Sequence, residues 1–137
     1  MTTPEITITT DKTKLDREWI TQRLQSTHWA SKRTDEAIHK SIETSLCFGV
    51  FQGSTQVGFG RVISDYATTA YLCDMIVEPD LRGQGIGQQL VERILTHPDL
   101  IGLKWILRTR NAASLYQRFG FEEAEYPGRF MERITRE

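Results

Sequence analysis

Long apolar runs, clustered cysteines and an excess of one charge are missing from this 137-residue sequence, and each absence excludes a class of protein. No apolar run approaches the roughly 20 residues that cross a bilayer, and the polar start MTTPEITITT lacks the basic and apolar regions of a signal peptide. We therefore expect a cytoplasmic protein with no membrane partner. Because 17 Lys and Arg face 18 Asp and Glu, for a formal net charge of -1, we also expect no nucleic-acid partner.

Cysteine is scarce as well. Cys47 and Cys73 form neither a CxxC pair nor a Cys/His cluster, so they are predicted to be buried free thiols, and no metal site is predicted. The length fits one domain over residues 1–137, with a core large enough to support a cleft. A homodimer is compatible with these properties.

What the sequence does contain is a glycine-rich stretch inside DMIVEPDLRGQGIGQQLVERI, residues 74–94. Met75-Ile76-Val77 predicts a strand buried on both faces, which Pro79 ends. Apolar residues then recur at helical spacing from Ile86 onward. The connection, residues 82–87, combines glycines with the unpaired N–H groups of a helix start, which is typical of a phosphate or pyrophosphate site. An ordinary glycine-rich turn is the alternative.

Two motifs carry a family resemblance. Arg82-x-x-Gly85-x-Gly87 resembles the acyl-CoA pyrophosphate motif of the GNAT superfamily of N-acetyltransferases, and LYQRFGF, residues 115–121, resembles its second signature. Many members carry an asparagine seven residues before the signature tyrosine, whereas Asn111 stands five before Tyr116. The resemblance spans residues 48–121.

Periodicity gives the order of the elements. Strands are predicted near 5–10, 46–51, 56–64, 68–77, 104–108 and 129–134, and helices from Lys14, over 34–44, from Ile86 and from Asn111. The predicted caps are Asp11 or Thr13, Thr34, His97 and Asn111. With the resemblance, this implies an α/β, GNAT-like fold: a mixed, mostly antiparallel sheet of about six or seven strands, a splayed parallel pair at strands 4 and 5, and about four helices.

The resemblance further implies acetyl-CoA as co-substrate, without a metal. It places cofactor contacts at Met75, Ile76, Val77, Arg82, Gly83, Gln84, Gly85, Ile86, Gly87, Asn111 and Tyr116. For Asn111, capping the next helix would be a sufficient role on its own.

Two residues are candidates for catalysis. Tyr116 matches the family tyrosine that hydrogen-bonds or protonates the sulfur of CoA, and packing beside Leu115 and Phe119 is its alternative role. Asp74 is the first candidate for the general base, because an acid within an apolar strand must face a polar cavity or pair with a cation. Pairing of Asp74 with Arg61 or Arg108 is the structural alternative, and Glu78 and Asp65 are weaker candidates for the base.

The loop over residues 26–33 has no periodicity, and a surface loop with Trp29 packed on the core would explain it. In the family this connection lines the acceptor side of the cleft, which makes Trp29 and Arg33 candidates for substrate binding. The sequence thus predicts an N-acetyltransferase for a primary amine of a small molecule, protein or peptide. A non-catalytic acyl-CoA sensor domain is the alternative. A toxin-like transferase acting on aminoacyl-tRNA is a third reading, which the lack of a basic patch disfavours.

Overall fold

Strands follow one another across a single sheet in chain order. The computed structural model describes residues 5–135, and these contain a five-stranded sheet ordered β1-β2-β3-β4-β5. Its strands are β1 (Thr7–Thr9), β2 (Leu46–Gln52), β3 (Thr55–Ser64), β4 (Thr69–Val77) and β5 (Lys104–Leu107). Neighbours from β1 to β4 are antiparallel, and β4 and β5 are parallel. The predicted α/β class and the parallel pair are confirmed.

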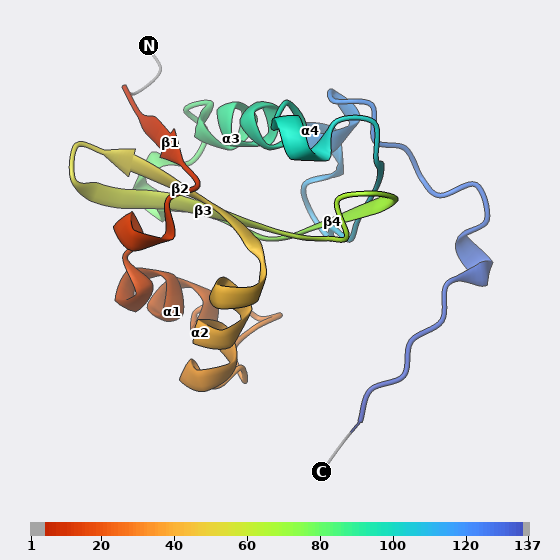
Figure 1. The fold of residues 1–137 in the computed structure, drawn as a ribbon, viewed down its shortest axis with the longest axis horizontal. Coiled ribbons are helices and arrows are strands. Elements are labelled where there is room, and N and C mark those ends of the chain that lie inside the picture. Colours follow the sequence, from red (N-terminus) through yellow and green to blue (C-terminus); the bar gives the residue numbers. More distant parts are fainter. Residues whose placement is uncertain (1–4, 136–137) are drawn as a thin grey trace.

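Helices cover both faces of the sheet (Figure 1). One face carries α1 (Arg17–Gln25) and α2 (Asp35–Thr44), and the other carries α3 (Ile86–Leu95) and α4 (Ala113–Gln117). Each layer has its own apolar cluster. Short 3-10 helices lie at Lys12–Lys14, Pro79–Leu81, Pro98–Leu100 and Pro127–Arg129. Among the described residues, none of the helices has the length and apolar character needed to cross a membrane.

Helix caps agree with the sequence only in part. Thr34 caps α2 as predicted, because its side chain accepts a hydrogen bond from the Ala37 N–H. The prediction for α1 is wrong: Asp16 is its cap, since Leu15 is extended and separates α1 from the 3-10 turn that Asp11 caps. His97 does not end α3 but caps the next 3-10 helix, where its Nδ1 accepts from the Asp99 N–H at 3.1 Å.

Asn111 is not the cap of α4. The N–H of Ala112 donates to Thr109 Oγ1 at 3.0 Å, so Thr109 orders this turn, and Ala112 takes the cap position without a side-chain bond. Asn111 remains exposed, and its side chain is available to a ligand.

A β-bulge interrupts β4 at Asp74. Phe59 pairs with Ile76 and Arg61 pairs with Cys73, so Asp74 and Met75 together oppose Gly60. Asp74 has a φ of 55°, a left-handed conformation that aspartate and asparagine tolerate better than most residues. The bulge changes which face the following side chains occupy: Ala70 and Leu72 pack under α3, whereas Ile76 packs under α1 and α2.

The predicted strand within Arg129–Ile134 is wrong. This segment begins with a 3-10 turn and continues without regular structure toward the C-terminus (Figure 1). Apolar side chains at 130, 131 and 134 cannot share one strand face, because strand side chains alternate. They stay exposed, with Met131 at 90%. For this reason the described residues form five strands rather than six or seven.

Candidate active site

The parallel strands β4 and β5 separate before β4 ends. Their pairing runs from Thr69 opposite Lys104 to Leu72 opposite Leu107, where β5 stops. Because β4 continues to Val77, its last residues have a partner strand only on the β3 side. The edge of β4 from Cys73 to Val77 is therefore open, which agrees with the predicted splayed pair.

Backbone direction shows which groups face this open edge. The Glu78 N–H donates to the Val57 carbonyl next to β3 at 2.7 Å. Since successive residues of a strand direct their N–H and C=O groups to opposite sides, those of Val77 and Met75 face the open edge. The Val77 carbonyl accepts from Arg82 Nε at 3.4 Å, in agreement with this orientation. The backbone of Ile76 faces β3, and its predicted contact with the cofactor stays a prediction.

The glycine-rich connection contains a run of unpaired backbone donors at the end of this edge. Gly83 and Gly85 have positive φ values of 79° and 86°, and Gly85 is the N-cap of α3 without a side-chain hydrogen bond. Within residues 5–135, the backbone N–H groups from Gly83 to Gln88 have no protein acceptor. A Cβ built on Gly83 meets no atom within 4 Å. Free amides, open space and the positive end of a helix dipole suit an anion.

A cleft of about 780 Å³ lies beside the open edge and collects most of the predicted catalytic and acceptor residues. Its lining residues are His28, Trp29, Arg33, Tyr71, Leu72, Cys73, Asp74, Met75, Leu107, Arg108, Thr109, Arg110, Asn111, Ala112, Tyr116, Glu132 and Ile134. The loop over residues 82–87 does not line this cleft but follows the end of β4. The site therefore has two parts, the anion loop and the cleft.

Asp74 is the buried ionic centre of the cleft. Its Oδ2 accepts from Arg33 Nη1 and from Arg61 Nε, both at 2.8 Å. The Asp74 side chain is 1% exposed and that of Arg61 is 11% exposed, whereas Arg33 reaches the cleft at 32%. Burial lowers the pKa of Arg61, but the opposing effects, of which the negative charge of Asp74 is the largest, together outweigh it, so the net shift is upward. The structural alternative for Asp74 is thus present with Arg61, but not with Arg108, and a role as general base stays a prediction.

The weaker candidates for the base lie elsewhere. Glu78 accepts from the Trp19 indole and from Arg23, both on α1. Asp65 accepts from backbone N–H groups in its own turn before β4, at Ala67 and Thr68. Neither residue lines the cleft.

Tyr116 combines packing with access to the cleft. The residue is 8% exposed, and its ring meets Phe121 edge-on at 5.9 Å between centroids. In residues 5–135 its hydroxyl has no protein hydrogen-bond partner, and the single fully enclosed side-chain polar atom without a partner is Thr21 Oγ1. The phenol oxygen therefore opens to the cleft. Burial raises the pKa of Tyr116 above its ordinary value of about 10, so the phenol keeps its proton at neutral pH.

Cys73 also lines the cleft, which the apolar pattern of β4 did not reveal. Its thiol donates to the Arg61 carbonyl at 3.4 Å. Burial raises the pKa of Cys73 to about 11, although Arg61 opposes the shift. At neutral pH the sulfur is a protonated thiol, which is a poor nucleophile. Burial was predicted for both cysteines: Cys47 is fully buried, whereas Cys73 is only partly buried.

Sequence reasoning missed the contribution of the C-terminal segment to the cleft. Glu132 and Ile134 line it, and Glu132 Oε1 forms an ion pair with Arg108 Nη1 at 2.5 Å. Arg108 also lies over the Phe130 ring at 5.6 Å. No local motif marks these residues, because they reach the cleft through contacts with segments that are far away in the sequence.

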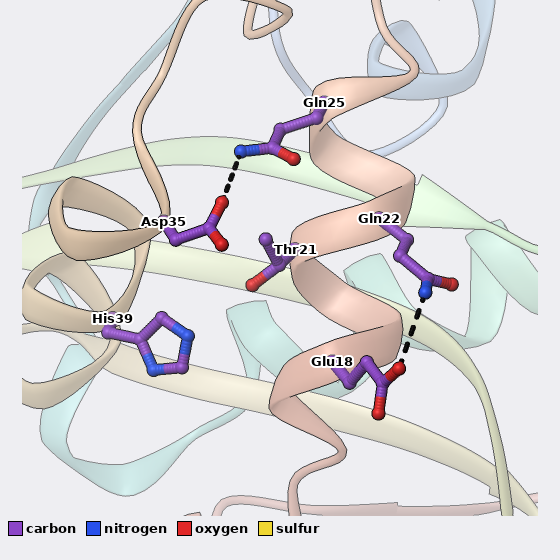
Figure 2. A pocket seen from close by; sticks show the side chains of 6 residues that line it. All are labelled: Glu18, Thr21, Gln22, Gln25, Asp35 and His39. Carbon is purple, nitrogen blue, oxygen red and sulfur yellow. Dashed lines mark hydrogen bonds between the residues drawn. The ribbon is translucent and has the colours of Figure 1, made fainter.

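A second, smaller hollow of about 350 Å³ lies between α1 and α2 (Figure 2). Its side chains come from those two helices: Glu18, Thr21, Gln22, Gln25, Asp35 and His39. Gln25 Nε2 donates to Asp35 Oδ1 at 2.7 Å and to the Arg33 carbonyl at 2.9 Å. This hollow therefore contains the contacts that hold the loop before α2.

Among residues 5–135, no group of three or more His, Cys, Asp or Glu side chains could hold a metal ion.

Replacing Asp74 with alanine should reduce the free energy of unfolding by about 3 kcal/mol or more, because the buried Arg61 charge loses its partner. Equilibrium urea unfolding measures this loss. Glu43→Ala is the matched control, since it removes a carboxylate from an exposed pair with Arg17 and should cost less than about 1 kcal/mol. Equal losses in the two variants would contradict the assignment of Asp74 as a buried ionic centre.

Alkylation of Cys73 should be slow at pH 7 and accelerate roughly tenfold per pH unit up to about pH 11, because only the thiolate reacts. Mass spectrometry of iodoacetamide adducts on a Cys47→Ala variant reports this profile for Cys73 alone. A rate that levels off near pH 8 would show a reactive cysteine and contradict the prediction.

Comparison with known proteins agrees with the geometry. An "Acetyltransferase (GNAT) domain" family model matches residues 43–123. The chain is 42% identical to a Xanthomonas campestris protein whose crystal structure is described as belonging to the GNAT family, with a TM-score of 0.92 over 96% of this chain and 94% of the other. A GNAT family protein from Streptococcus pneumoniae is 25% identical with a TM-score of 0.72, covering 97% of this chain and all of the other.

A curated relative is more distant and longer. GCN5-related N-acetyltransferase 2, chloroplastic, from Arabidopsis thaliana is 36% identical over 69 residues, which make up 48% of this chain and 26% of that protein. The matched segment thus spans about a quarter of its length. The family model alone covers more than half of the present chain. This protein belongs to the GNAT family of acetyltransferases.

Proposed function

We propose that this protein transfers the acetyl group of acetyl-CoA to a primary amine of a small molecule, protein or peptide. The observation that carries the proposal is the set of unpaired backbone N–H groups from Gly83 to Gln88 at the end of an open strand edge. A diphosphate needs several hydrogen-bond donors and close backbone approach, and the free N–H groups and open space of the glycine loop support its binding there. A solved structure from Clostridium acetobutylicum that is described as containing acetyl-CoA shares the fold, with a TM-score of 0.67 at 12% identity.

The chain's own residues divide the binding of acetyl-CoA between them. In this proposal the diphosphate lies against the loop over residues 82–87, with Arg82 adding positive charge. Met75 and Val77 present N–H and C=O groups along the open edge, where the amides of the pantetheine arm can add to β4 as a further strand would. Asn111 is exposed at the cleft and is proposed as an additional contact.

The thioester supplies an acyl carbonyl that is already activated toward an amine. The cleft holds the amine beside it, so that approximation contributes several kcal/mol. As the new C–N bond forms and the C–S bond breaks, Tyr116 donates its phenol proton to the departing thiolate. The proton that the nitrogen loses as the amide forms passes to water, and water returns a proton to the Tyr116 phenolate. The raised pKa of Tyr116 keeps that proton in place before transfer. Because the Cys73 thiol is protonated, direct attack by the amine is favoured over an acetyl-cysteine intermediate.

Gly87→Asp should weaken CoA binding at least tenfold, as its carboxylate would stand among the N–H groups that hold the diphosphate. The same acid lies in the first turn of α3, where it favours the helix dipole, so thermal stability should fall little or not at all. Isothermal titration calorimetry with CoA and a melting curve measure the two effects.

Gly87→Ala is the matched control for that variant. Its Cβ would approach Leu115 Cδ2 at 3.8 Å, an ordinary contact, so CoA binding should stay within about threefold of wild type. If the aspartate and alanine variants bind CoA equally well, the glycine loop is not the diphosphate site.

Tyr116→Phe should lower kcat by about 100-fold or more while leaving CoA affinity unchanged, because the ring still packs on Phe121 but the proton donor is lost. Release of free CoA with an amine panel gives kcat, and calorimetry gives the affinity. An unchanged kcat would remove Tyr116 from the mechanism. Absence of CoA release with every amine, in wild type as well, would instead favour a non-catalytic acyl-CoA-binding domain.

A further inference from the structure

Arg33 is held in place at both its backbone and its side chain. Its N–H donates to the Ala30 carbonyl at 3.1 Å, and its carbonyl accepts from Gln25 Nε2 at 2.9 Å. Ala30 is 2% exposed and anchors the loop in the core. The Gln25 side chain extends from α1 toward Asp35 on α2 (Figure 2), which ties the loop to both helices. The position of Arg33 is thus set before any ligand arrives.

The guanidinium of Arg33 has an occupied side and an accessible side. Nη1 donates to Asp74 Oδ2, and the guanidinium carbon lies 5.7 Å from the centre of the Trp29 ring. That is within the range of a cation–π contact. In the part of the chain that the structure describes, the other N–H groups of Arg33 have no acceptor. A guanidinium with several free donors, fixed at a cleft wall, is suited to a carboxylate or phosphate.

The net charge around the cleft is positive, like the charge of Arg33. Asp74 is shared by Arg33 and Arg61, so one carboxylate opposes two guanidinium groups. Glu132 is the other acid of the lining, and it is paired with Arg108, while Arg110 adds a further positive charge. Both acids of the lining are therefore engaged with arginines. A purely cationic acceptor, such as a polyamine, would meet repulsion here, whereas an anionic group would be attracted.

We propose that the acceptor carries an anionic group, a carboxylate or a phosphate, next to its primary amine, and that Arg33 binds this group. The inference rests on the proposed acetyl transfer and names the class of its acceptor. Asp74 and Trp29 hold the guanidinium, the free N–H groups bind the anion, and the amine is directed toward the open edge of β4. Amino acids, amino acid derivatives and aminoalkyl phosphates have this chemistry.

Matched acceptors test the proposal on the wild-type protein. Release of CoA from acetyl-CoA is measured with amino acids and their carboxamides, and with aminoalkyl phosphates and the corresponding amino alcohols. The best anionic acceptor should have a kcat/KM at least about tenfold above that of its neutral partner. This ratio corresponds to the lower end of the free-energy range of a charge-assisted hydrogen bond. Whether the carboxylate or the phosphate series is favoured identifies the anion. Equal transfer to neutral and anionic partners would overturn the proposal and leave the acetyltransferase activity intact.

Variants of Arg33 assign the preference to this residue. Arg33→Gln should lower kcat/KM for the anionic acceptor about 10- to 100-fold and for its neutral partner by less than about threefold. Arg33→Lys should retain part of the preference, because the charge remains and the planar donor arrangement is lost. Arg17→Gln removes one charge from the exposed α1 surface and should keep the full preference. A preference that survives Arg33→Gln, or an equal loss for both acceptors, would contradict a binding role for Arg33.

Calorimetry with CoA distinguishes a loss of acceptor binding from a loss of CoA binding or of the folded structure. Arg33→Gln should bind CoA as wild type does, because Asp74 keeps its contact with Arg61 and the glycine loop is unchanged. Loss of CoA binding together with transfer would show that Arg33 is structural and would overturn the assignment. If wild type binds CoA but acetylates no member of either series, the acceptor proposal fails, and the proposed activity fails with it only when the wider amine panel releases no CoA either.

Discussion

The carboxylate of Asp74, enclosed between two guanidinium groups, is the interaction on which the geometry of the site depends. Burying an ion is costly unless it is paired, and Arg61 and Arg33 meet that requirement from β3 and from the loop before α2. The bulge at Asp74 lets the carboxylate reach both partners, at the cost of a left-handed backbone. One contact therefore links two strands of the sheet to the loop that carries the proposed acceptor site.

The second constraint is the early end of β5. With only four residues, β5 pairs with the first half of β4 and leaves the second half open. Backbone groups without partners are unfavourable in a protein interior but useful at the edge of a cleft, because a ligand can satisfy them. The bulge lies in this unpaired half, so the point where the strand changes faces is also the point where ligand and protein would meet. Arg33, Tyr116 and Met75 converge there on one cleft.

Much of this arrangement could be predicted from the sequence, because it depends on local chemistry. The glycine loop after an apolar strand, the buried tyrosine before Gly120 and the aperiodic loop with Trp29 each have a signal within about ten residues. The bulge has none: burial alternates without interruption from Thr69 to Val77, although the face occupied by the side chains changes at Asp74. Arg61 was among the predicted partners of Asp74, but the second partner, Arg33, and the place of Glu132 depend on contacts between distant segments, which no local pattern encodes. The last predicted strand failed because its apolar spacing fits no single face.

The C-terminal segment has a practical consequence for handling this protein. Glu132 and Ile134 lie at the cleft, while β1 forms the opposite edge of the sheet from β5. A tag that follows closely after Ile134 would begin near the cleft wall and obstruct entry. Purification tags and surface tethers are therefore better attached before β1, whose position leaves the mouth of the cleft unobstructed.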